Sequence, residues 1–237
     1  MLRRIRIILA TLFFLSVTAL FIDSTGMAKE WLGWTAKIQF LPALLALNVV
    51  TVLALVVLTL LVGRAYCSVI CPLGVMQDVI SRISGLRKKK KSRFSYSGEK
   101  KWLRYGILVI FVVALVAGLT PLAALLAPYS SYGRMVSSVV SPSLSPVAIV
   151  AAVSFVVVAI MSWLGGRTYC NTICPVGTIL GFFSRFALFR PIIDTSKCNS
   201  CKRCAKKCKA SCIDAKNHRI DYSRCVACMD CIKNCKH

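Results

Sequence analysis

Histidine and acidic residues are scarce in this sequence of 237 residues, which contains two histidines and eight aspartates and glutamates. Both histidines, His218 and His237, lie near the C-terminus, so the apolar part of the chain has no histidine pair to ligate a b-type haem. No carboxylate lies within the long apolar stretches either, which argues against a buried proton relay of the pump type. The sequence therefore excludes haem as a cofactor of this chain and disfavours a proton pump.

Four long apolar stretches take up much of the remaining sequence. They contain no charged residue or histidine, and each is near the ~20 residues that cross a bilayer as a helix. The stretches are residues 7–22, 38–62, 106–127 and 147–164. We therefore predict an all-α transmembrane domain of four helices over residues 1–190. A cleaved signal peptide is the alternative for residues 7–22, but no small-residue cleavage motif follows, which favours a retained helix.

The basic residues are distributed unevenly between these stretches. Of the 31 lysines and arginines, 28 fall in the N-terminal tip, in residues 63–105 and in the segment from Gly165 onward. By the positive-inside rule, both termini and the C-terminal segment face the cytoplasm, as in a multi-pass protein of the bacterial inner membrane. The net charge of +23 lies beside apolar stretches, so we expect contact with anionic lipid and no nucleic-acid partner. The basic run at residues 88–91 is interpreted as a solvated loop.

A twelve-residue motif occurs twice in the chain. Residues 63–74 read Gly-Arg-Ala-Tyr-Cys-Ser-Val-Ile-Cys-Pro-Leu-Gly, and residues 166–177 match them at eight of twelve positions. Each copy follows the second helix of an expected pair, so we predict two parallel two-helix repeats related by an axis along the membrane normal. The cysteines of both copies should then converge at the cytoplasmic ends of the second and fourth helices. These cysteines are Cys67, Cys71, Cys170 and Cys174.

Three roles fit these four cysteines. Cysteines at positions i and i+4 share one helix face, so the two pairs could together bind a metal ion or a third cluster. They could also act as two redox-active dithiols, or serve only as a helix-end packing motif with the following proline. Arg64 and Arg167 beside them would either stabilise thiolates or anchor the helix ends at lipid headgroups. Among the other polar residues, Gln39 and Asn48 are expected to be helix-packing contacts, and Asp78 an ordinary surface charge.

The C-terminal segment contains two Cys-x2-Cys-x2-Cys-x3-Cys motifs. This spacing lets three thiolates reach one cubane cluster while the fourth cysteine reaches the other cluster. The first cluster takes Cys198, Cys201, Cys204 and Cys235, and the second takes Cys225, Cys228, Cys231 and Cys208. Two four-cysteine zinc sites are the structural alternative, but zinc has no need of a third cysteine so soon after the second. Cys212 lies outside both sets and is expected to be a small buried packing residue.

Residues 197–237 resemble the two-cluster bacterial ferredoxins, with lysine in place of proline after each fourth cysteine, at Lys209 and Lys236. The resemblance implies a small α+β module with two [4Fe-4S] clusters over residues 191–237. Positive charge beside a cluster should raise its potential.

The whole chain resembles the NapH and MauN family of ferredoxin-type membrane proteins. The resemblance rests on the four apolar stretches, the two Cys-x3-Cys-Pro units and the terminal pair of cluster motifs. It implies a component of a quinol dehydrogenase that moves electrons between the quinone pool and a protein redox partner.

Two other functions remain as alternatives. A thiol or metal reductase that assists assembly of another metalloenzyme would use the four repeat cysteines to bind or reduce copper-like ions. A membrane anchor that recruits a soluble partner would use the clusters only structurally.

Overall fold

The computed structural model describes residues 2–23, 26–87, 94–141 and 145–235. The basic run at 88–91, Lys236 and His237 lie outside the described residues. Helices α1 to α7 span Leu2–Ile22, Met27–Lys37, Phe40–Leu45, Val49–Val62, Ala65–Val69, Pro72–Arg87 and Lys101–Val116. Helices α8 to α14 span Thr120–Leu126, Pro128–Val140, Pro146–Gly165, Thr168–Thr172, Pro175–Ser184, Arg203–Lys207 and Asp230–Asn234. Strands β1 (Ile213–Asp214) and β2 (Arg219–Ile220) pair antiparallel.

Two of the described helices, α1 and α10, are long and apolar enough to cross a membrane. The predicted four spans are therefore not confirmed. The stretch 38–62 is split into α3 and α4 by Leu47, which has a positive φ of 51°, and by Asn48, whose side chain caps α4. The stretch 106–127 is split at Gly118, where φ is +70°, so that α7 ends at Val116 and α8 follows.

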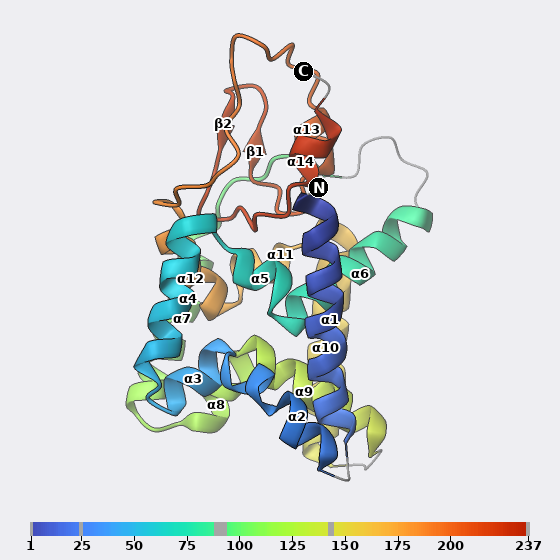
Figure 1. Ribbon diagram of the computed structural model, residues 1–237, viewed down its shortest axis with the longest axis vertical. Coiled ribbons are helices and arrows are strands. Elements are labelled where there is room, and N and C mark those ends of the chain that lie inside the picture. The colour runs from blue at the N-terminus through green and yellow to red at the C-terminus, as the bar shows by residue number, and fades with distance from the viewer. Residues whose placement is uncertain (1, 24–25, 88–93, 142–144, 236–237) are drawn as a thin grey trace.

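The longer helices expose apolar side chains on their outer faces. Leu53 and Val57 of α4, Val109 and Val113 of α7, and Ile149 of α10 are each at least 47% exposed. Large contiguous apolar surfaces are rare on soluble monomers and common where a protein meets lipid. In Figure 1 these helices run along the long axis of the molecule, with α2, α3, α8 and α9 at one end and the cysteine-rich tail at the other.

The two copies of the repeated motif fold alike. After α4 the chain reverses at Gly63 (φ 76°) into the short helix α5, and after α10 it reverses at Gly166 (φ 71°) into α11. The prolines that follow the second cysteines begin the next helices, α6 and α12, because proline lacks an N–H that the first helical turn does not need. The prediction that the cysteines sit at the ends of the long helices is therefore wrong in detail. They lie on separate helix-turn-helix units.

The helix after each Cys-x3-Cys-Pro turn packs against a long helix of the other half of the chain. Helix α6 of the first half packs against α10 of the second, and α12 of the second half packs against α4 of the first. The exchange brings the two Cys-x3-Cys-Pro turns into one buried cluster that contains Cys67, Cys71 and Cys174.

The tail forms a small module at one end of the helices (Figure 1). The hairpin β1–β2 lies between the two cysteine motifs, and the short helices α13 and α14 pack against each other. Cys208, Cys212, Ile213 and Val226 belong to a core that is separate from that of the helices. The module has the small α+β character that the sequence predicts.

Candidate iron-sulfur and thiol sites

The cysteines of the tail gather around two cavities. One cavity of about 250 Å³ is lined by all the cysteines assigned to the first cluster, together with Cys231. They are Cys198, Cys201, Cys204 and Cys235. A second, smaller cavity is lined by Cys208, Cys225, Cys228 and Cys231, together with Cys212. The fourth cysteine of each motif thus lies with the first three of the other motif.

Both cavities fit the donor sets that [4Fe-4S] clusters require. Each is lined by the four cysteines of one predicted set, by one further cysteine, and by apolar side chains such as Ile213 and Ile220, which line both cavities. In residues 2–235, as far as they are described, no three His, Cys, Asp or Glu side chains lie close enough to hold one metal ion. A cubane takes one thiolate at each of four irons, so its ligands stand farther apart than those of one tetrahedral zinc.

Cys212 is buried, as expected, but it also contacts two of the predicted ligands. Its Sγ lies 3.5 Å from the Sγ of Cys208. The hydrogen bond with Cys212 lowers the pKa of Cys208 to about 6, and a second one lowers the pKa of Cys225. Burial, in contrast, raises the pKa of Cys231 to about 12. The extra cysteine therefore touches the second cysteine set, which its position outside the motif spacing did not indicate.

The two cysteine sets of the tail differ in exposure. Cys208, of the second set, is 6% exposed. Ala227, which lines the same cavity, lies against Gly63 at the end of helix α4, 4.0 Å from the position that a Cβ there would take. Cys201 and Cys235 are exposed. The second set thus faces the helices, while the first set reaches the outer surface of the module.

The four cysteines of the repeats lie together in the interior. Each is 2–3% exposed. Cys174 has Cys170, Cys71 and Cys67 as its close electrostatic neighbours. Two N–H donors point at these sulfurs: Gln77 Nε2 lies 3.1 Å from Cys170 Sγ, and the amide of Gly177 lies 3.4 Å from Cys174 Sγ.

Two arginines connect the two repeats. Arg64 of the first repeat donates to the carbonyl oxygen of Cys170, at 3.1 Å, and Arg167 of the second repeat donates to that of Cys67. Both arginines are fully buried. Gly74 and Gly177 are required beside these bonds, because a Cβ at either would collide with the carbonyl and the guanidinium.

The charges of the two arginines are balanced differently. Arg167 pairs with Asp78 at 2.8 Å. Arg64 makes no ion pair with any described residue, and its Nε has no hydrogen-bond partner there. Position 181, which corresponds to Asp78 in the second repeat, is glycine. A buried guanidinium without a carboxylate is costly unless another anionic group lies near, and Cys67 Sγ lies 3.9 Å from Arg64.

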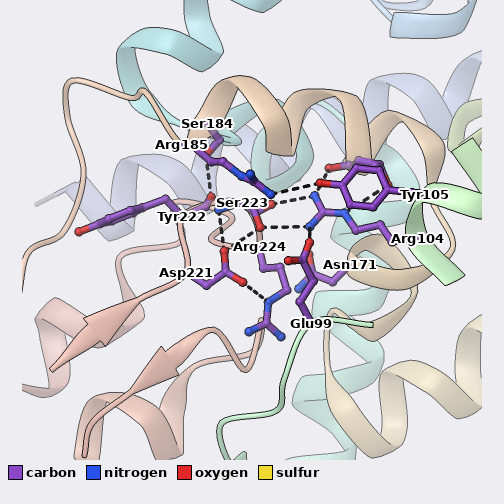
Figure 2. Close-up of polar contacts among 12 residues, drawn as sticks. Glu99, Arg104, Tyr105, Asn171, Ser184, Arg185, Asp221, Tyr222, Ser223 and Arg224 are labelled. Carbon is purple, nitrogen blue, oxygen red and sulfur yellow. Dashed lines mark hydrogen bonds and ion pairs between the residues drawn. The ribbon is translucent and has the colours of Figure 1, made fainter. Parts of the chain in front are cut away.

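Arg64 also joins the repeat cysteines to the tail. Its Nη1 donates to the side chain of Asn171 at 2.7 Å and to the carbonyl of Ser223 at 3.2 Å. Ser223 precedes Cys225 by two residues, and Arg64 lies within electrostatic range of that cysteine. Figure 2 shows Arg104 of α7 bound to the same serine and to Glu99.

Asp78 forms a second connection to the tail, so the prediction of an ordinary surface charge is wrong. Its carboxylate, 12% exposed, pairs with Arg167, with Arg6 of α1 at 3.2 Å and with Lys209 at 3.3 Å. Burial alone would raise the pKa of Asp78, but the three positive charges hold it well below its usual range. Lys209 pairs also with Asp230 at 3.1 Å.

The remaining polar predictions concern packing. Gln39 is buried and accepts a hydrogen bond from the hydroxyl of Tyr66, as expected for a helix contact. Asn48 is exposed and caps α4 by accepting from the amide of Thr51, so the prediction of a helix-packing contact is wrong for this residue. Gln77, Arg104 and Asn171 were not singled out from the sequence, because nothing in their spacing signals that the exchanged helices bring them to the cysteines.

Comparison with known families agrees with the duplication. A family model described as a 4Fe-4S binding domain matches the chain twice, over residues 44–93 and 147–195. Each match contains one Cys-x3-Cys-Pro unit, and both end before Cys198, the first cysteine of the tail motifs.

The chain is similar to several proteins of known families. The putative electron transport protein YccM of Escherichia coli is 25% identical over 71% of this chain and 47% of its own length. The methylamine utilization ferredoxin-type protein MauN of Paracoccus denitrificans is 25% identical over 62% of this chain and 48% of its own. The ferredoxin-type protein NapH of Haemophilus influenzae is 26% identical over 62% and 47%. The chain thus spans about half the length of these relatives.

No solved structure matches the chain significantly. The relatives are ferredoxin-type and electron-transport proteins, and the matched domains are of the 4Fe-4S type. The comparisons therefore support a ferredoxin-like protein that is similar to NapH and MauN.

Proposed function

We propose that the chain is a multi-pass membrane protein that transfers electrons between the quinone pool and a protein redox partner through two [4Fe-4S] clusters. The observation that carries this proposal is the order of the cysteine sites. The repeat cysteines lie among the helices, the second tail set follows across Arg64 and Ser223, and the first tail set lies at the exposed end. Such an order leads from the apolar helices to the surface.

The chemistry of the sites suits this function. A bound [4Fe-4S] cluster supplies one-electron redox chemistry, so two can take both electrons of a quinol that is oxidised to the quinone with release of two protons. The chain holds the inner cysteine set by Arg64, Arg104 and Ser223. The exposed Cys201 and Cys235 leave the outer set accessible to a partner protein.

Placement in the bacterial inner membrane is supported by charge and surface. The outward faces of α1, α4, α7 and α10 are apolar. Basic residues concentrate around the tail, which by the positive-inside rule supports a cytoplasmic position of the tail. The helices α4 and α7 have 14 and 16 residues and would rise only about 21 and 24 Å.

The four repeat cysteines are proposed to lie on the electron route. The charge of Arg64 and the N–H donors of Gln77 and Gly177 would offset part of the cost that burial places on an anionic sulfur at Cys67, Cys170 or Cys174. A thiolate pair, a third cluster and a bound metal ion would each involve anionic sulfur at these cysteines. The copper-type reductase rests on these same cysteines and is the second candidate.

Serine substitution separates these functions. We compare quinol-driven reduction of the tail clusters, followed by electron paramagnetic resonance, in the wild type and in C67S/C170S. The proposal expects slower reduction in the variant with unchanged iron in the tail. The reductase alternative expects loss of copper reduction while quinol still reduces the tail clusters at the wild-type rate.

A further inference from the structure

A large apolar pocket opens between α1, α9 and α10, away from the tail. Its volume is about 750 Å³, which is within the range of small-molecule sites. Phe14 and Thr18 of α1, Met76 of α6, Tyr132 of α9, and Ala152 and Phe155 of α10 line it. In Figure 1, α9 lies toward the end of the molecule that is opposite the cysteine-rich module, and α1 runs from that end to the module.

A pair of hydroxyl groups lies in the wall of this pocket. The Oγ1 of Thr18 donates to the carbonyl oxygen of Phe14 at 2.6 Å and lies 2.6 Å from the hydroxyl oxygen of Tyr132. Because threonine has a single hydroxyl proton, Tyr132 must donate to Thr18. The Tyr132 oxygen is then left with lone pairs that can accept a hydrogen bond from a ligand. The ring of Phe14 packs against that of Tyr132 at a centroid distance of 5.5 Å.

The pocket adjoins the repeat cysteines. Met76 is five residues beyond Cys71, or about 7.5 Å along α6. Tyr132 belongs to the same buried cluster as Cys71 and Cys174. A ligand bound here would therefore lie near the repeat cysteines, with Met76 and Tyr132 between the ligand and the thiols.

We propose that this pocket binds the head group of a lipid-soluble quinol, with one quinol hydroxyl donating to the Tyr132 oxygen. This inference rests on the proposed function and assigns the place where the quinol sits. A quinol is favoured over a phospholipid acyl chain because an acyl chain has no donor for the Tyr132 oxygen. The small side chains Ala148, Ala151 and Ala152 leave a flat face on α10 that suits a ring.

The test fills the pocket from an exposed position. Ala152 and Val153 are adjacent and exposed on α10, but only Ala152 lines the pocket. We measure equilibrium binding of a short-chain quinol to purified A152W and V153W, and the initial rate at which that quinol reduces the tail clusters. Iron content per chain reports that both variants fold. A152W should weaken binding at least about tenfold, the loss expected for a blocked apolar site, whereas V153W should stay within about twofold.

Tyr132→Phe tests the hydrogen bond separately. Loss of one hydrogen bond should weaken quinol binding about threefold to tenfold. Binding of the dimethyl ether of the same quinol, which has no hydroxyl to donate, should stay unchanged. Equal weakening for quinol and ether would overturn the role of Tyr132.

The outcomes separate the pocket from the function. Quinol could reduce the wild-type clusters while A152W binds quinol, and its clusters are reduced, as in the wild type. The assignment of the quinol to this pocket would then be wrong, and the proposed function would stand. Equal losses in A152W and V153W would overturn the pocket as well. If the A152W protein loses phospholipid that co-purifies with the wild type but binds quinol as the wild type does, the pocket is an acyl-chain site and the inference fails. Wild-type clusters that no quinol reduces would overturn the proposed function and this site with it.

Discussion

The substitution Asp78→Asn tests how the tail is held against the helices. It removes a carboxylate that pairs with Arg167, Arg6 and Lys209. Removing one partner of a buried ion pair costs about 3–5 kcal/mol, because the opposite charges stay buried without compensation. Lys209 keeps Asp230 and Arg167 keeps the carbonyl of Cys67, so we take the lower value of ~3 kcal/mol. The undocked tail should then be populated about a hundredfold more.

Amide hydrogen exchange measures this population directly. The amide of Arg167 donates across the interface to the carbonyl of Lys209 at 2.9 Å, so it exchanges when the tail leaves. Asp214→Asn is the control, since the hydrogen bonds of Asp214 stay within its own turn. An exchange rate of Arg167 that is the same in D78N, D214N and the wild type would refute the reasoning.

The pH dependence of the same exchange follows from the lowered pKa of Asp78. A carboxyl whose pKa is lower in the folded state stabilises it above the unfolded pKa of about 3.9 and loses that effect as the pH falls. The population of the docked tail should therefore stay constant between pH 8 and pH 5 and fall below about pH 4. Weakening that begins near neutral pH would point to another group.

Three further predictions concern composition, topology and the repeat cysteines. Anaerobic analysis should find about eight iron atoms per chain with equal labile sulfide if only the tail binds clusters, and stoichiometric zinc without sulfide would contradict this. A cysteine introduced at the exposed Lys29 should react with an impermeant maleimide in intact cells, and one at Lys216 should not; the reverse pattern would invert the topology. In C67S and in C170S, tail iron should remain at the wild-type level, and its loss would make these residues structural for the tail.

The sequence predicts the cysteine chemistry better than the path of the chain. The spacing from Cys198 to Cys235 is enough to group the tail cysteines, since local turns fix which sulfurs can share a cubane. The two cavities are lined by the same two groups of four, with Cys231 at both and Cys212 added at the second. The repeated motif likewise predicts that the two Cys-x3-Cys-Pro units meet.

Helix breaks and exchanged packing were not predictable in the same way. Leu47 and Gly118 break the helices through their positive φ values. Hydropathy does not predict these breaks, because both residues lie among apolar neighbours. The surface role given to Asp78 failed for a tertiary reason. Its partners Arg167 and Lys209 are 89 and 131 positions away, and only the exchange of α6 and α12 between the halves brings them together.

The central claim is that quinol electrons reach the tail clusters through this chain. We titrate the anaerobically purified, oxidised protein with a short-chain quinol and record the electron paramagnetic resonance spectrum at each step. The account predicts signals of two interacting reduced [4Fe-4S] clusters that quinol produces more slowly in C67S/C170S than in the wild type, while dithionite produces them equally in both. Clusters that dithionite reduces but quinol leaves oxidised in the wild-type protein would contradict it.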